Sequence, residues 1–279
     1  MATIINGKEI AAKIEKSVRN RVDDLKRKGK VVRLDVILVG DNQASETYVK
    51  RKSEAADRVG IDFTLHRLPA DVTARAIIKK IKDVQKKSSG LLIQLPLPEK
   101  LYTPDILNAI DPNVDVDCLT HENLGRLVMK SHFVAPPTPG AALAILKELN
   151  INLSGKDITI IGTGALVGKP LAIMLVNEGA SVTTCNSRTK NLKEKCLSAD
   201  IIVTGVGKKD IVRGDMVKPG AIVIDTGFVY ENGKLMGDVN FDEVSKVAGH
   251  LTPTPGGVGP ITVAQLLQNT IICAEKKFE

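Results

Sequence analysis

The stretch DITIIGTGALVGKP, residues 157–170, decides the fold that the sequence predicts. It begins with a short apolar run that is typical of a buried strand, and a helical pattern at 168–178 follows it. Between them lie Gly162, Gly164 and Gly168. A strand, a glycine-rich turn and a helix in this order indicate a βαβ unit in a parallel sheet.

The same rhythm of apolar runs and helical patterns occupies both halves of the chain. The predicted strands lie at 33–40, 61–68, 90–98, 157–164, 181–185, 200–207 and 221–228. The predicted helices lie at 6–28, 42–59, 73–87, 168–178, 190–198 and 261–278, with one more that ends at Leu149. Nearly continuous apolar strands joined by helices imply parallel sheets that are covered on both faces.

The length of 279 residues exceeds the usual size of a single core, so two domains are expected. We predict an α/β protein with two α/β domains around a cleft. The first comprises residues 1–139, and helix 261–279 returns to it. The second, residues 140–260, is a Rossmann-type NAD(P)-binding domain. The loop TPTPGGVGP at 252–260 suits a crossing between the two domains.

Composition narrows the classes of partner. The net charge is +7, but aromatic residues make up only 3% and the lysines are scattered, which argues against nucleic acid and favours a small anionic ligand. No apolar run approaches the roughly 18 to 20 residues of a membrane span. The first residues lack the plan of a secretory signal, and the four cysteines form no C-x-x-C pair. We expect a cytoplasmic protein with reduced thiols.

The glycine spacing is G-x-G-x-x-x-G, one residue longer than the G-x-G-x-x-G dinucleotide fingerprint. Such glycines let backbone amides approach a pyrophosphate at a helix N-terminus, although a plain strand-to-helix turn is the alternative. After the next strand come Asn186, Ser187 and Arg188 in place of a carboxylate. A guanidinium can pair with a 2′-phosphate, so NADP is favoured over NAD, and a simple polar loop is the alternative.

Three residues of the first half are candidates for chemistry. Tyr48 and Lys52 are four positions apart on a predicted helix and therefore share a face. An exposed basic turn is the alternative. Gln94 falls at the carboxyl end of a buried strand, where parallel sheets place ligand sites, and its amide could hold an amine neutral or merely cap the strand.

The segment DPNVDVDCLTHE at 111–122 has acidic residues at spacings that resemble a calcium loop. Val116 occupies the sixth place, where such a loop needs glycine, and Pro112 occupies the second. We therefore expect no metal site. A lone carboxylate such as Asp117 could instead accept paired donors from a guanidine-like edge of a heterocycle.

Taken together, these residues resemble one family along nearly the whole chain, the bifunctional methylenetetrahydrofolate dehydrogenase/cyclohydrolases of the FolD family. The motifs that carry the resemblance are Tyr48-x-x-x-Lys52, LLIQLPLP around Gln94, DVD ending at Asp117, P-x-T-P-G at 136–140, GDV at 237–239 and PGGVGPIT at 255–262.

The resemblance implies NADP-dependent oxidation of 5,10-methylenetetrahydrofolate to 5,10-methenyltetrahydrofolate, followed by hydrolysis to 10-formyltetrahydrofolate. These reactions belong to one-carbon metabolism and purine biosynthesis, and the family is usually a homodimer. Lys52 is implied as the acid/base group, with Gln94 tuning it. Tyr48 would position the folate, and Asp117 would grip the pterin edge. The implied cofactor residues are Gly162, Thr163, Gly164, Ser187 and Phe228, and the charge of Arg188 adds it to this set as the partner of a 2′-phosphate.

The loop at Pro255, Gly256 and Gly257 is expected to approach the substrate closely, and an interdomain turn is its alternative. Two departures from the family pattern stand out. Thr163 replaces an arginine that many members set against the 2′-phosphate, and Cys118-Leu119 replaces Gly-Phe. A dehydrogenase without the hydrolytic step, and a noncatalytic nucleotide-sensing or nucleic-acid-binding module, are the alternative functions.

Overall fold

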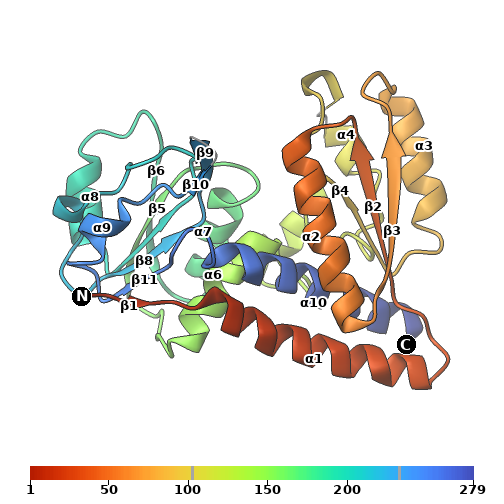
Figure 1. The fold of residues 1–279 in the computed structure, drawn as a ribbon, viewed down its shortest axis with the longest axis horizontal. Coiled ribbons are helices and arrows are strands. Elements are labelled where there is room, and N and C mark those ends of the chain that lie inside the picture. The colour runs from red at the N-terminus through yellow and green to blue at the C-terminus, as the bar shows by residue number, and fades with distance from the viewer. Residues whose placement is uncertain (102–103, 232–233) are drawn as a thin grey trace. The chain divides into compact units, whose positions relative to one another are not determined.

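The computed structural model describes residues 1–101, 104–231 and 234–279, which form two compact units (Figure 1). The lysine unit, named for Lys52, comprises Ala12–Pro137 and Val263–Glu279. The glycine unit, named for the glycine turn at 162–168, comprises Met1–Ala11 and Thr138–Thr262. Each unit has a parallel sheet with helices, so the predicted α/β class is confirmed.

The lysine unit is built on a three-stranded parallel sheet in the order β3-β2-β4. Its strands are β2 (Arg33–Val39), β3 (Asp62–Leu68) and β4 (Gly90–Ile93). The central strand β2 is buried from Leu34 to Val39, which explains its nearly unbroken apolar sequence. Val36 is in register with Leu65 on one side and Leu92 on the other.

Helices cover both faces of this sheet. The helical segments of the unit are α1 (Gly7–Arg27), α2 (Gln43–Val59), α3 (Ala74–Val84), η1 (Glu99–Leu101), α4 (Pro104–Leu107), α5 (His121–Val128) and α10 (Val258–Phe278). Val36 of β2 packs in a cluster with residues of α2 and α10, whereas Ile37 packs with residues of α3. Helices α1 and α10 begin in the glycine unit and continue in the lysine unit.

Helix α2, which carries Lys52, has a defined start and stop. The Asn42 side chain accepts the backbone N–H of Ser45, which satisfies an amide that the helix leaves unpaired. Gly60 ends the helix with φ 77°, a left-handed conformation that glycine adopts at no steric cost. The predicted helix 42–59 is thereby confirmed.

The glycine unit has a six-stranded sheet in the order β1-β11-β8-β7-β5-β6, with parallel pairing throughout. Its strands are β1 (Thr3–Ile4), β5 (Asp157–Ile161), β6 (Ser181–Cys185), β7 (Ile201–Thr204), β8 (Ile222–Asp225) and β11 (His250–Leu251). Its helical segments are α6 (Pro137–Glu148), α7 (Gly168–Asn177), α8 (Leu192–Ser198), η2 (Gly214–Met216) and α9 (Phe241–Val244). An antiparallel pair, β9 (Val229–Glu231) and β10 (Lys234–Met236), follows β8.

The structure differs from the sequence prediction at several element ends. Helix α10 begins at Val258 and not at 261, because Pro260 is tolerated in a first helical turn, where its missing N–H needs no partner. Strand β1 was not predicted, and it joins the sheet through Thr3 opposite His250. Among the described residues, no helix combines the length and the apolarity that a membrane crossing needs.

Candidate active site

Lys52 and Gln94 meet in the lysine unit. Lys52 lies on α2 and Gln94 directly follows β4, and the Lys52 Nζ is 3.0 Å from the Gln94 Oε1. The other end of the amide is also fixed, because Nε2 donates to the Leu95 carbonyl at 2.7 Å. Since Nε2 can only donate, this second bond orients Oε1 toward the amine. Gln94 is buried, and its own N–H donates to the Ile37 carbonyl of β2.

The surroundings of the Lys52 amine disfavour its charge. Lys52 is half-buried over its whole length, but protein atoms pack densely around its amine, and this desolvation lowers the pKa of Lys52 against the opposing attraction of Asp117. Desolvation likewise raises the pKa of Asp117, although the Lys52 charge opposes the shift and Asp115 adds to it. Burial therefore outweighs mutual attraction for both groups, and it favours the neutral form of each.

Asp115 organises the backbone that follows Asp117 in the chain. It is 1% exposed, and its carboxylate accepts the N–H groups of Leu119 (3.2 Å) and Thr120 (2.9 Å). The hydroxyl of Thr120 (2.8 Å) and the side-chain amide of Asn123 (3.0 Å) donate to it as well. A buried carboxylate with this many donors holds the turn after Asp117 in one conformation.

Cys118 has the backbone conformation that favours glycine. Its φ is 55°, in the left-handed region that glycine occupies freely and other residues adopt at a cost of about 1–2 kcal/mol. The usual glycine of the family fits this backbone without strain. The Cys118 side chain is buried, and its thiol donates to the Val134 carbonyl at 3.6 Å. The departure thus leaves the turn in the conformation that glycine would favour.

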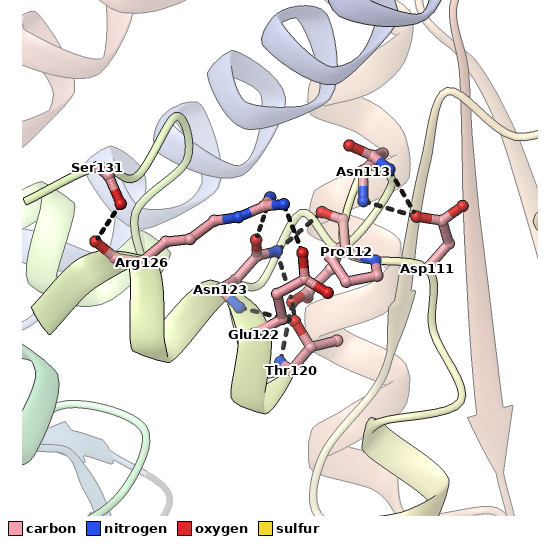
Figure 2. A network of polar contacts seen from close by, with 9 residues as sticks. Asp111, Pro112, Asn113, Thr120, Glu122, Asn123, Arg126 and Ser131 are labelled. Carbon is pink, nitrogen blue, oxygen red and sulfur yellow. Dashed lines mark hydrogen bonds and ion pairs between the residues drawn. The ribbon is translucent and has the colours of Figure 1, made fainter. Parts of the chain in front are cut away.

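Three acidic residues of 111–122 are engaged with protein donors, namely Asp111, Asp115 and Glu122, and Figure 2 shows the contacts of Asp111 and Glu122. Asp111 accepts both the backbone and the side-chain N–H groups of Asn113, and Glu122 pairs with Arg126 at 2.5 Å. Asn123 bridges Asp115 and the Pro112 carbonyl. Within the described ranges, no group of three or more His, Cys, Asp or Glu side chains could hold a metal ion.

Tyr48 lies on α2 one helical turn before Lys52 and is half-buried. The guanidinium carbon of Arg51 lies 5.9 Å from the centre of its ring, within cation–π range. The structure thus places Tyr48, Lys52, Gln94 and Asp117 in one unit. It links Lys52 directly to Gln94 by a hydrogen bond and to Asp117 by electrostatic interaction.

The glycine turn between β5 and α7 has the close contacts of a dinucleotide-binding turn. A Cβ at Gly168 would lie 1.8 Å from the Gly162 carbonyl oxygen, and one at Gly162 would lie 2.7 Å from the Gly205 carbonyl oxygen. Gly162 also has φ 113°. Only glycine fits at these two positions, and the turn leads into the N-terminus of a ten-residue helix. Backbone amides and the helix dipole at such an end suit a pyrophosphate.

The other predicted cofactor residues lie at the carboxyl ends of neighbouring strands. Ser187 and Arg188 follow β6 and are exposed, and the Arg188 N–H donates to the Asn186 side chain at 2.9 Å. Phe228 follows β8 and is 43% exposed. Within the turn itself, Thr163 is half-buried and Gly164 is exposed. The parallel order β8-β7-β5-β6 brings these strand ends to one edge of the sheet.

The predicted substrate loop belongs to the glycine unit and not to the unit of Lys52. The Gly256 carbonyl accepts the Gly7 N–H at 3.1 Å, and a Cβ at Gly7 would lie 1.8 Å from the Gly257 carbonyl oxygen. Gly256 has φ 101°, and Pro255 is exposed and follows a cis peptide bond. The loop is thus tightly packed against the start of α1.

Two buried aspartates of the glycine unit were not singled out as site residues by the sequence analysis. Asp225 ends β8, and Asp238 stands in the GDV motif that contributed only to the family resemblance. Asp225 is 4% exposed and Asp238 is fully buried. An aspartate at the carboxyl end of a buried strand is the signal that could have found Asp225.

A parallel sheet with a glycine turn, together with a lysine–amide pair in a second α/β unit, defines the class of dinucleotide-dependent enzymes. The model of the catalytic domain described as "Tetrahydrofolate dehydrogenase/cyclohydrolase" matches residues 5–117, and that of the NAD(P)-binding domain matches residues 136–278. The chain therefore belongs to the tetrahydrofolate dehydrogenase/cyclohydrolase family, which confirms the resemblance.

Individual relatives are similar to this chain over nearly their full length. The bifunctional protein FolD of Nautilia profundicola is 46% identical, covering 98% of this chain and 97% of its own. The crystal structure of the bifunctional FolD of Campylobacter jejuni has a TM-score of 0.96 at 41% identity, covering 99% of this chain and 100% of its own. The FolD of Trypanosoma brucei, complexed with NADP and an inhibitor, has a TM-score of 0.96 at 34% identity, covering 100% and 99%.

Proposed function

We propose that this chain oxidises 5,10-methylenetetrahydrofolate with NADP and hydrolyses the methenyl product to 10-formyltetrahydrofolate, and that Lys52 is the acid/base group of the hydrolysis. The observation that carries the proposal is the 3.0 Å hydrogen bond between Lys52 and the fixed oxygen of Gln94, at an amine whose charge burial disfavours. Relatives that are named bifunctional do not favour the alternative of a dehydrogenase without the hydrolytic step.

The hydrolysis needs a group that can both take and return protons. Water adds to the cationic methenyl carbon and loses a proton, for which the neutral Lys52 amine is the acceptor. The bond from this carbon to N5 then breaks as N5 gains a proton and the new hydroxyl group loses its proton, which leaves the formyl group on N10. One water is consumed and one proton is released overall. General acid/base help of this kind contributes about 10²- to 10⁴-fold.

The other residues of the lysine unit bind and orient the folate in this proposal. Tyr48 stacks on the ring system from the same face of α2. Asp117 accepts paired N–H donors from the pterin edge, and the donors gathered by Asp115 keep its backbone in place. Residues 1–139 with the final helix 261–279 are proposed as the folate domain, and residues 140–260 as the NADP domain.

The glycine unit would hold NADP, which when bound supplies the acceptor for the hydride of the one-carbon bridge. Gly162, Thr163 and Gly164 approach the pyrophosphate. The absence of side chains at Gly162 and Gly168 allows the tight turn that this approach needs. Ser187 and Arg188 bind the 2′-phosphate. Many family members contact this phosphate with an arginine at the position of Thr163, and in this chain Arg188 makes that contact instead. Phe228 contacts the cofactor, and Pro255, Gly256 and Gly257 contact the substrate.

The cell context and assembly are part of the same proposal. All four cysteines are free and buried, as in proteins of a reducing compartment, which supports a cytoplasmic location. The family resemblance supports a homodimer, which sedimentation velocity would detect as twice the 30.0 kDa chain mass. No nucleic-acid or membrane partner is proposed.

The test uses the purified protein with methylenetetrahydrofolate and either NADP or NAD. Formation of the reduced coenzyme reports the first reaction, and decay of methenyl absorbance reports the second. We expect faster reduction of NADP than of NAD, and methenyl decay above the uncatalysed rate. Reduction with methenyl decay at the background rate would instead establish the dehydrogenase alone.

A further inference from the structure

Asp238 ties down the loop that follows β7 in the glycine unit. Its Oδ2 accepts the hydroxyl of Thr204 at 2.8 Å and the N–H of Val206 at 2.7 Å, and its Oδ1 accepts the N–H of Lys208 at 2.8 Å. The carboxylate is fully buried, so these bonds are shielded from water. A single side chain thus fixes the loop at both of its ends.

This loop packs directly on the glycine turn. Gly205 and Val206 lie so close to Gly162 that a Cβ there would be 2.7 Å from the Gly205 oxygen and 3.0 Å from the Val206 Cγ1. Gly162, Gly168 and Gly205, together with Thr204 and Thr226, line one small indentation beside the turn that has no room for a water molecule. The Gly205 backbone and the Val206 side chain both contact Gly162, so a shift of 205–206 displaces groups that lie directly against the glycine turn.

The segment that follows β8 also packs closely on Asp238. A Cβ at Gly227 would lie 2.1 Å from the Asp238 carboxyl carbon, so the residue before Phe228 must be glycine. Asp225 accepts the N–H groups of Gly227 and Val239 at 3.0 Å each. The two aspartates therefore join the loops after β7 and β8 to the segment 237–239.

We propose that Asp238 is a positioning residue for the NADP site, which holds the loop 205–208 at the separation from the glycine turn that a bound dinucleotide requires. This proposal rests on the proposed function. Asp238 does not itself touch the turn; it acts through Val206 and Lys208. This positioning role gives a function to the GDV motif at 237–239, which takes no part in the proposed acid/base chemistry or folate binding.

Both oxygens of the carboxylate are needed for the three bonds. In an Asp238→Asn variant one oxygen still accepts Thr204 and Val206, but the amide NH₂ then faces the N–H of Lys208, which has no acceptor. Loss of one hydrogen bond to a charged group weakens an equilibrium by about ten- to a hundredfold. We expect this loss in the affinity for NADP.

The experiment compares Asp238→Asn with Asp242→Asn, the same chemical change at an exposed position nearby. Calorimetric titration gives the dissociation constant of NADP, and steady-state assays give the dehydrogenase KM and kcat. Hydrolysis of supplied methenyltetrahydrofolate, which consumes no NADP, reports the lysine unit separately. Asp238→Asn should weaken NADP binding at least tenfold and leave this hydrolysis within twofold of the wild type, and Asp242→Asn should change neither.

A second pair of variants keeps the test decisive where Asp238→Asn fails to fold. Thr204→Val removes one donor to Asp238 at nearly constant volume, and Thr204→Ser keeps the hydroxyl. We expect weaker NADP binding in Thr204→Val and recovery in Thr204→Ser. Unchanged NADP binding in Asp238→Asn or Thr204→Val, or equal losses in both reactions, would overturn the positioning role. Wild-type protein that binds NADP without reducing it would count against the proposed function alone.

Discussion

Gln94 presents its carbonyl oxygen, and not its NH₂ group, to the amine of Lys52 at 3.0 Å, because the NH₂ group is already bound to the Leu95 carbonyl. The oxygen accepts a hydrogen bond from either protonation state of the amine and carries no full charge. Burial is then free to lower the pKa of Lys52. A carboxylate in this place would have the opposite effect.

Replacement of Lys52 by methionine removes the amine and keeps the length of the side chain. We expect the hydrolysis of methenyltetrahydrofolate to fall by at least about 100-fold, the lower end of general acid/base help. NADP binding should stay as in the wild type. The control is Lys50→Met on the same helix, where the side chain is 79% exposed and pairs with Glu54. Equal rates of methenyl hydrolysis in the two variants would show that Lys52 is not the acid/base group.

Replacement of Gln94 by glutamate tests the tuning of the amine. A negative charge beside Nζ favours the ammonium form, so the pKa of Lys52 should rise. The hydrolysis rate, which increases with pH as the amine loses its proton, should then reach its plateau at a higher pH than in the wild type. The pH profile of methenyl hydrolysis provides the measurement, and coincident profiles for the two proteins would refute the tuning.

We expect the buried carboxylate of Asp115 to contribute to the stability of the fold. Asp115→Ala leaves the donors of Leu119, Thr120 and Asn123 without their buried acceptor. We expect the free energy of unfolding to fall by about 3 kcal/mol or more. The control, Asp71→Ala at an exposed position, should change it by less than about 0.5 kcal/mol. Denaturant titration measures both, and similar small losses would show that Asp115 does not hold the turn.

Asp225 makes the stability depend on pH. Burial raises its pKa to about 7, against the N–H of Val239 and with the help of the Asp238 charge. In the unfolded chain the same carboxyl ionises near pH 4. Between about pH 4 and 7 the native protein therefore binds more protons than the unfolded chain, so this group lowers the free energy of unfolding as pH rises through that window. Above the window its contribution is constant.

The measurement is the difference in the free energy of unfolding between the wild type and Asp225→Asn. For one proton this difference should change by up to about 1.4 kcal/mol per pH unit within the window, the wild type losing stability relative to the variant as pH rises. A difference that is independent of pH between 4 and 7 would mean that Asp225 ionises normally in the native protein.

The parts of the site that lie close in sequence or repeat with a regular period were predictable. The four-residue spacing of Tyr48 and Lys52 put them on one helical face, and Gln94 was recognisable at the end of an apolar strand. Gly162 and Gly168 were found from the strand and helix on either side of them. Each of these inferences needs only local geometry.

The parts that depend on contacts between distant segments were not predictable. Asp238 binds Thr204 and Val206, which lie more than thirty positions earlier, and no periodicity relates them. Strand β1 has two residues, too few to show an alternating pattern, and its place is set by its pairing with β11.

The protonation of Lys52 itself is the most direct test of the account. Protein labelled with ¹⁵N at the lysine side chains, with the Nζ signal of Lys52 assigned by its loss in Lys52→Met, can be titrated by NMR. We predict a midpoint clearly below that of the exposed Lys50 in the same sample, because burial disfavours the ammonium form. A Lys52 midpoint equal to or above that of Lys50 would contradict the neutral amine on which the hydrolysis depends.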